Sequence, residues 1–278
     1  MADSSWNKEQ CVTLVPFPDT WAGTARALHE YSRVIGAIPR AHADPQPNWW
    51  HIGLIIEGQS LVTVPVPLPD GGSLRLGMAP ARHMAWMQTT GDEHAEFAMD
   101  AGVAANDFAD QLFGRVAALG LAGDYDRSRF ASDESHPYDR EAATAYWGNL
   151  TAIAGVLERR RAEMEGEPGP VHLWTHHFDL SFEWYGTRSI EGEDGTDSLG
   201  QINLGFNVLD EQYLYSSPWP FDDSLTGAPL PGPARWHTEG WNGSMVPYEA
   251  LVGRIDWEEF VLEYARAVFT AARPTIMA

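Results

Sequence analysis

The stretch that decides the fold is WHIGLIIE at residues 50–57, because its pattern recurs in outline as HFDLSFE at residues 177–183. In both stretches a His is followed three residues later by Leu and six residues later by Glu. Each stretch lies between an amphipathic helix pattern and a series of short strand patterns that ends in another helix. We expect two similar halves that face each other, each offering a His and a Glu from its first strand.

The order of the expected elements repeats in the same way. Apolar residues at helical spacing predict helices over 20–38, 106–119, 139–165 and 256–272, and strand patterns cover 49–57, 60–67, 73–78 and 84–90, then 171–187, 199–208, 211–216 and 234–247. We therefore expect an α+β fold of two similar helix–antiparallel sheet–helix halves packed about a pseudo-twofold seam. The expected boundaries are 1–120 for the first half, 121–138 for a linker and 139–278 for the second half, together in one compact unit.

The composition is that of a globular protein, and it narrows the range of partners. The 278 residues are 44% hydrophobic and 21% charged, which suits a large core. A net charge of −21 repels nucleic-acid phosphates and anionic membranes, so we expect neither partner. Twelve Trp residues favour an aromatic core, and several of them could instead line a cleft.

The single cysteine and the lack of long apolar runs bear on location. Cys11 has no second cysteine to pair with, which fits a reducing cytoplasm. The N-terminal sequence MADSSWNKEQ lacks the basic and apolar regions of a secretory signal. No apolar run approaches the ~20 residues that span a bilayer. We expect a soluble, cytoplasmic protein.

One strand face of the second series is almost wholly polar. If 171–187 is one strand, alternation places on one face Thr175, His177, Asp179, Ser181, Glu183 and Tyr185. A sheet with one solvated face explains this without any function. The functional alternative uses His51 as a general base or polar anchor, with Asp179 or Glu183 orienting it across the seam. Gly53, on the face of His51, could leave room for a ligand.

His177 and Asp179 also form a His-x-Asp pair that could bind one metal. With His237 as the third ligand, or His51 in its place, they would make the two-His-one-carboxylate triad of non-heme iron enzymes. HExxH, paired CxxC and EF-hand patterns are absent, so zinc and calcium have little support. GxGxxG and P-loop patterns are absent too, and no nucleotide cofactor is expected.

Further side chains could contact a substrate. Arg188 could clamp a substrate carboxylate or pair with the acidic loop at 191–197. His136 could anchor the linker or reach the seam, and Trp50 and Trp236 could form walls. A Pro-rich loop at 217–233, of the kind that often acts as a lid, is flanked by Tyr213, Tyr215, Trp219, Trp236 and Trp241.

Short motifs along most of the chain resemble one family. They are NWWH at 48–51, SLVT at 60–63, Phe130, Asp133, His136, Tyr138-Asp139, Trp147, PVH at 170–172, FDL at 178–180, GTR at 186–188, GF at 205–206, Tyr213, YSSP at 215–218 and VPYE at 246–249. In these residues the chain is similar to the domain-of-unknown-function family 5996. The resemblance implies no particular reaction.

The same resemblance ranks the candidate site residues. Members often carry a small residue where this chain has His177, and they tend to have a carboxylate near the position of Gln201. The resemblance therefore favours Trp50, Asp179, Arg188 and Tyr248 over His177.

The sequence leads us to expect a small-molecule-binding protein, with acid–base catalysis as an option, and an aromatic-walled cleft between two similar halves. Two alternatives stay open. One is a non-heme iron oxygenase that uses His177, Asp179 and His237. The other is a non-enzymatic interaction module whose exposed aromatic side chains bind a partner protein, which predicts a flat patch without a deep cavity. The substrate and the oligomeric state are left open.

Overall fold

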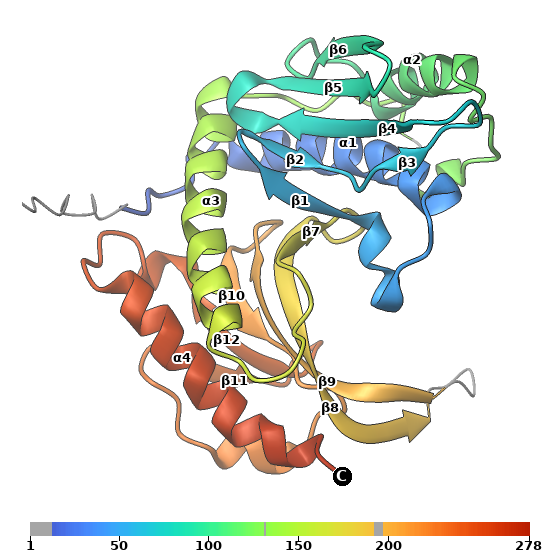
Figure 1. Ribbon diagram of the computed structural model, residues 1–278. Helices are drawn as coiled ribbons and strands as arrows, with labels where there is room; N and C mark the ends of the chain where they lie inside the picture. Colours follow the sequence, from blue (N-terminus) through green and yellow to red (C-terminus); the bar gives the residue numbers. More distant parts are fainter. Residues whose placement is uncertain (1–12, 131, 192–196) are drawn as a thin grey trace, which may run out of the picture.

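The computed structural model describes residues 13–130, 132–191 and 197–278 (Figure 1). The long helices are α1 (Trp21–His42), α2 (Ala105–Ala118), α3 (Arg140–Ala162) and α4 (Trp257–Ala272). The strands are β1 (Gly53–Glu57), β2 (Ser60–Val62), β3 (Val66–Pro67), β4 (Ser73–Ala79), β5 (Met84–Thr89) and β6 (His94–Ala98), then β7 (His172–Trp174), β8 (Asp179–Glu191), β9 (Asp197–Asn207), β10 (Tyr213–Ser216), β11 (Arg235–His237) and β12 (Gly243–Pro247).

Within the described residues the strands form a single twelve-stranded sheet. Its order is β11-β12-β10-β9-β8-β7-β1-β2-β4-β5-β6, with β3 paired to β4 off this path. Neighbouring strands pair antiparallel, including β1 with β7 at the centre. The predicted α+β class with antiparallel sheet is confirmed, whereas the duplication and its pseudo-twofold seam stay predictions.

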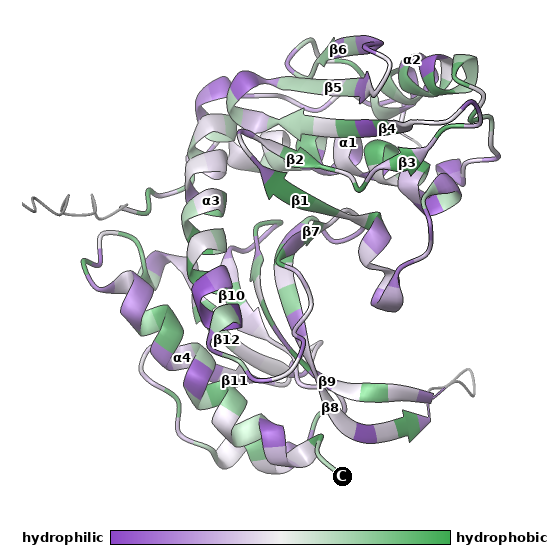
Figure 2. Cartoon of the chain, viewed as in Figure 1, coloured by the Kyte–Doolittle hydropathy of each residue, from purple (hydrophilic) through white to green (hydrophobic). Residues whose placement is uncertain are grey.

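The central pair of strands is short and tightly packed. Gly53 pairs with Trp174 and Leu54 with Leu173, and β1 is largely hydrophobic along its length (Figure 2). A Cβ atom on Gly53 would lie 2.5 Å from Cδ2 of the His172 ring. The space that the sequence suggested for a ligand at Gly53 is therefore filled by that ring, and the glycine allows two strands to approach.

The chain before β1 does not continue the strand as predicted for 49–57. Residues Pro47–Ile52 form a short 3₁₀ segment, η1, and the strand begins only at Gly53. Asn48 and Trp49 have φ angles of 52° and 61°, in the left-handed region that side chains other than Gly rarely adopt. The reversal at these two residues turns the Trp49-Trp50 pair away from the line of the strand.

The predicted strand at 171–187 is two strands joined by a tight turn. Residues 175–178 form the turn, in which the Phe178 amide donates a hydrogen bond to the Trp174 carbonyl at 2.7 Å. Phe178 has a φ of 57°, and its ring is fully buried. The chain reverses at this left-handed residue, so His177 lies in the turn and not on a strand face with Asp179.

The helices agree closely with the sequence pattern. Asp139 caps α3, as predicted, because its carboxylate accepts hydrogen bonds from the amides of Glu141 and Ala142. Figure 1 shows α3 running beside both parts of the sheet, and it contacts α1 as well as α4 and β8. None of the described helices combines the length and apolar character that crossing a lipid bilayer requires.

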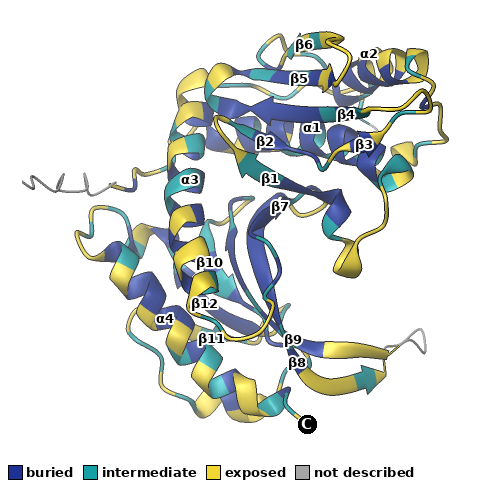
Figure 3. Ribbon diagram, viewed as in Figure 1, coloured by how far each residue is buried: buried dark blue, intermediate teal, exposed yellow. Residues whose placement is uncertain are grey.

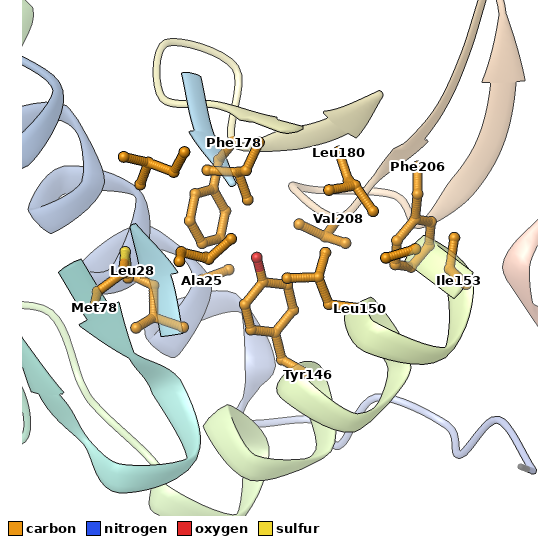
Figure 4. Packing of buried hydrophobic residues seen from close by; sticks show 14 of the residues in the cluster. Ala25, Leu28, Met78, Tyr146, Leu150, Ile153, Phe178, Leu180, Phe206 and Val208 are labelled. Atoms are coloured by element: carbon orange, nitrogen blue, oxygen red, sulfur yellow. The ribbon is translucent and has the colours of Figure 1, made fainter. Parts of the chain in front are cut away.

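The main core joins side chains from both parts of the chain (Figure 4). Tyr146 of α3 stacks on Trp21 of α1, with ring centroids 5.0 Å apart, and on Phe178 at 5.5 Å. Leu28 and Leu180 belong to the same cluster. The main core is thus shared by both parts of the chain, and residues 119–139 connect α2 to α3. The division into two halves and a linker within one compact unit stays a prediction.

Candidate functional site

A pocket of about 1060 Å³ lies over β8 and β9, where η1 and the 175–178 turn approach them. Its charged side chains are Arg40, Glu167, Asp179, Glu183 and Asp197. Its aromatic side chains are Trp49, Trp50, Trp174, Tyr185, Tyr215 and Trp219. Carboxylates therefore outnumber guanidinium groups in a wall that is otherwise largely aromatic.

The first half of β8 supplies the polar floor. Asp179, Ser181, Glu183 and Tyr185 alternate along the strand and all line the pocket, while the intervening side chains are buried on the other face. Figure 3 shows this stretch of β8 buried and the far end of the β8–β9 hairpin exposed. The predicted polar face is thus present from Asp179 onward, and its side chains Asp179, Ser181 and Glu183 are buried at the floor of an open pocket.

Asp179 is buried, with 6% of its surface exposed. The Tyr215 hydroxyl of β10 donates a hydrogen bond to its Oδ2, across Gly205 of β9. A Cβ atom on Gly205 would lie 2.5 Å from Cζ of Tyr215, so only glycine lets the ring reach the carboxylate. Burial raises the pKa of Asp179, and the Tyr215 hydrogen bond opposes that rise.

Glu183 has a different environment, although it is equally buried at 5% exposure. Its Oε1 accepts hydrogen bonds from Trp174 Nε1 at 3.1 Å and from Ser181 Oγ at 3.2 Å. Burial raises the pKa of Glu183, these hydrogen bonds lower it, the negative charge of Asp179 raises it further, and the neighbouring Trp50 indole lowers it.

Three buried polar atoms of the lining residues have no hydrogen-bond partner among the described residues. They are Oδ1 of Asp179, Oε2 of Glu183 and Nε1 of Trp50. The last two lie close together, since a Cβ atom on Gly169 would be 3.1 Å from each of them. An unpartnered buried polar group costs about 1–3 kcal/mol, so these atoms are held in place at the expense of stability.

The turn at 175–178 adds two histidines to the wall, His176 and His177. The pKa of His176 is lowered to about 4, first by burial and then by His177 and Arg40. His176 is therefore neutral at physiological pH.

The predicted iron triad is not assembled. His237 lies on β11, and three strands, β12, β10 and β9, separate it from β8. Neither His237 nor His51 lines the pocket with His177 and Asp179. In the described part of the chain no three His, Cys, Asp or Glu side chains are grouped so that they could hold a metal ion. The turn at Phe178 takes His177 off the strand that carries Asp179, although both residues line the pocket.

His51 stands behind the pocket wall rather than in it. It is 4% exposed, its Nδ1 accepts a hydrogen bond from the Gln46 amide at 3.2 Å, and its ring stacks on Trp49 at 5.5 Å. Burial and the charge of Arg40 lower its pKa. The structure gives it the role of supporting Trp49, and it does not reach Asp179 or Glu183 as an oriented base would.

Glu57, the glutamate of the first motif that matches Glu183, also lies outside the pocket. Glu57 is 56% exposed at its side chain and forms a surface ion pair with Arg75 of β4. The two sequence motifs that look alike therefore place their carboxylates in opposite environments, one in solvent and one in the pocket.

Four more predicted binding residues lie outside the pocket. Arg188 is in the exposed end of β8 and donates to the Thr275 carbonyl at 3.1 Å. Trp236 donates to the Ala228 carbonyl at 2.9 Å, and Tyr248 donates to the Val15 carbonyl at 2.8 Å.

His136 also has a structural partner, Glu30 of α1, at 3.0 Å. Each of these four side chains ties a loop or a chain end to the fold. Of the aromatic residues that flank the Pro-rich loop, Tyr215 and Trp219 do line the pocket.

Sequence reasoning missed Arg40, Trp49 and Trp174 as lining residues. Trp49 is the most informative, because it is 59% exposed and sits in strained backbone. Trp219 and Leu199, at 37% and 47% exposure, lie on the same pocket. Three of the five large apolar side chains that the described residues expose thus surround this one pocket.

Comparison with known proteins gives a family and no activity. The model of a family described as a family of unknown function (DUF5996) matches residues 16–276, which confirms the resemblance seen in the sequence. Neither a curated protein nor a solved structure matches the chain.

Proposed function

We propose a function from the pocket itself, because the chain belongs to the DUF5996 family and that family is one of unknown function. In this proposal the chain binds a small organic molecule over β8 and β9. Asp179 and Glu183 hydrogen-bond the molecule and can exchange a proton with it. Trp49, Trp50 and Trp219 cover its apolar surface.

The observation that carries the proposal is the set of unpartnered atoms on Trp50, Asp179 and Glu183. Two carboxyl oxygens and one indole N–H form a pattern of acceptors and a donor on residues that line one pocket. A ligand with hydroxyl or amine groups would complete their hydrogen bonds. Pockets that bind small molecules combine such a few polar groups with apolar walls.

The two carboxyls are suited to acid–base chemistry by their surroundings. Burial raises the pKa of both, so each carboxyl holds its proton to a higher pH than an exposed one. Their supports differ, with one tyrosine hydroxyl on Asp179 and two donors on Oε1 of Glu183. Groups in unlike environments can take unlike roles, one as acid and one as base.

The exposed aromatic side chains are also the feature that an interaction module would need. Such a module predicts a flat patch, whereas Trp49 and Trp219 stand at a pocket of about 1060 Å³ with a polar floor. That volume and floor favour the small molecule.

A thermal-shift screen tests the proposal. Amines, amino acids and sugars are added to the purified chain, and a true ligand at 100 times its Kd stabilises the fold by about 2.7 kcal/mol. We expect the stabilisation to be lost in Asp179→Asn and Glu183→Gln and retained in the control Glu57→Gln, which changes a surface carboxylate of the same chemistry. Hits that stabilise the Asp179→Asn, Glu183→Gln double variant as well as the wild type would place binding elsewhere and end the proposal.

A further inference from the structure

A second pocket, of about 460 Å³, lies between α1 and residues 124–130. Arg33, Ala37 and Arg40 follow one face of α1 at helical spacing, and Arg129 reaches in from the opposite wall. Gly36 and Ala41 are small, and at Gly36 the Thr175 side chain packs against the helix, since a Cβ atom there would lie 2.6 Å from Thr175 Oγ1. Three arginines converge on one hollow of a chain whose net charge is −21.

The opposite wall is held rigidly. Tyr125 stacks on Phe113 with ring centroids 4.1 Å apart, and its hydroxyl donates to the Leu121 carbonyl at 3.0 Å. Phe130 is buried at 3% exposure and also packs on Phe113. The position of Arg129 relative to α1 is therefore set by the core and not by a free loop.

Two carboxylates also line this pocket, Asp124 and Asp126. Asp126 is already committed, because its Oδ1 accepts from the amide and hydroxyl of Ser128, and its Oδ2 accepts from Arg129 Nε at 2.9 Å. Three guanidinium charges against two carboxylate charges leave a local excess of one positive charge.

Most guanidinium N–H groups in the pocket lack a partner in the described structure. Each guanidinium has five N–H donors. Arg33 uses one of them, on the His176 carbonyl at 3.1 Å, and Arg129 uses its Nε on Asp126. Arg40 makes no hydrogen bond or ion pair with any described residue, and its guanidinium lies over the Trp49 ring at 5.7 Å. Arg33 and Arg40 are half-buried, where donors are costly unless something accepts from them, whereas the Arg129 side chain is 54% exposed.

All three arginines lie close enough to His176 to lower its pKa, so their charges are gathered around one residue. Burial and His177 are the main causes that lower the pKa of His176, and Arg40, Arg33 and Arg129 each lower it further. The repulsion also falls on the arginines themselves, since Arg129 lowers the pKa of Arg40 after burial does, while Asp126 raises it. A bound negative charge would relieve this repulsion.

We infer that this second pocket binds an oxyanion, a phosphate or carboxylate group, between Arg33, Arg40 and Arg129. The planar fork of N–H donors on arginine matches the oxygens of both groups and makes strong charge-assisted hydrogen bonds with them. The site does not depend on the function proposed above. Arg40 and His176 line both pockets, so the oxyanion would lie next to the small-molecule pocket.

Arginine side-chain NMR tests the inference on the full chain. The Nε–H signals of ¹⁵N-arginine-labelled protein are followed during titration with sodium phosphate, sodium acetate and sodium chloride at constant ionic strength. The signals of the pocket arginines are assigned by their loss in Arg40→Gln and Arg129→Gln. We expect saturable movement of these signals with phosphate or with acetate, and the anion that saturates at lower concentration identifies the group.

The variants decide the outcome. Either substitution should weaken the affinity for the saturating anion by about tenfold or more, because it removes a charged hydrogen-bond donor. Arg115→Gln, which changes an exposed arginine on α2, should leave the affinity unchanged. Asp179→Asn should leave it unchanged too, which separates this site from the first pocket. Equal, non-saturating movement with all three salts, or unaltered affinity in both pocket variants, would overturn the inference.

Discussion

Replacing Glu183 by Gln tests whether the buried carboxyls of the pocket lower the free energy of unfolding. The amide oxygen of Gln can keep the hydrogen bonds from Trp174 and Ser181, so the buried charge is lost, while a neutral NH2 group takes the place of Oε2 near Trp50 Nε1. A buried polar atom without a partner costs about 1–3 kcal/mol, and a charged one more. We therefore expect Glu183→Gln to raise the free energy of unfolding at pH 8 by about 1–3 kcal/mol. Each kcal/mol raises Tm by about 2–4 °C in a protein of this size.

The pH dependence gives the sign of this effect. The folded state raises the pKa of Glu183, so it binds the proton more tightly than the unfolded state does. The stability that the protonated carboxyl contributes is present at acid pH and is lost as the pH rises through the raised pKa. The variant lacks this titration, so its advantage over the wild type should be absent at acid pH and grow toward pH 8.

The assay is thermal unfolding of the wild type and the variant across pH 4 to 8, with Glu57→Gln as the matched control. Arg75 holds the pKa of Glu57 below its usual range through a hydrogen bond, and the pair is on the surface. The free energy of unfolding of Glu57→Gln should be at most about 1 kcal/mol below that of the wild type at pH 8, and close to it at acid pH. This change has the opposite sign to the one expected for Glu183→Gln. A Glu183→Gln protein that unfolds at a lower temperature than the wild type at pH 8 would refute the reasoning, because the charged carboxylate would then be favourably bound.

Three further substitutions separate packing from binding. Gly53→Ala places a methyl group 2.5 Å from the His172 ring and should lower the free energy of unfolding, measured by thermal unfolding, by about 1–3 kcal/mol. Gly148→Ala, a position within α3 whose added methyl group would meet no other atom, should be neutral or stabilising. Equal effects of the two substitutions would contradict the tight packing of β1 on β7. Trp49→Ala should change Tm little, since the ring is exposed, but should weaken any ligand found in the screen, and unchanged affinity would remove this ring from the site. Tyr215→Phe takes the hydroxyl from the buried carboxyl at the start of β8 and should cost about 1–3 kcal/mol at neutral pH, a loss that should shrink as the pH falls and the carboxyl is protonated; a loss independent of pH would show that packing alone is responsible.

Local patterns predicted the parts of the fold that local physics decides. Periodic apolar residues located the four long helices, and the cap at Asp139 was read correctly because capping needs only the residue and the next three amides. The alternation of β8 from Asp179 to Tyr185 was visible for the same reason. Strands were wrongly extended before Gly53, through His177, and across the breaks between β2 and β3 and between β11 and β12. The first two are at left-handed residues other than Gly, which no propensity indicates.

The site was harder to predict because its partners come from long-range pairing. Tyr215 reaches Asp179 only because β9 lies between their strands and carries a glycine at the crossing. Nothing in the two similar motifs indicates that Glu57 meets an arginine in solvent while Glu183 meets indole and hydroxyl donors in a pocket. Arg40 was missed since its place on α1 marks it as a helix-surface cation, and only the fold brings Trp49 and Arg129 to it.

Half of the buried polar side-chain atoms that lack a partner among the described residues lie at the first pocket, on Asp179, Glu183 and Trp50. The other three are on Arg75, Tyr146 and His172, and Arg40 keeps unpaired donors where the two pockets meet. Violations of this kind are expected at functional sites, because a ligand supplies the missing partners and the fold carries the cost without it. The two effects are linked in a single residue: if Glu183→Gln stabilises the free protein, the same substitution must abolish the response to the ligand, and a variant that gained stability while binding normally would separate the buried charge from the function.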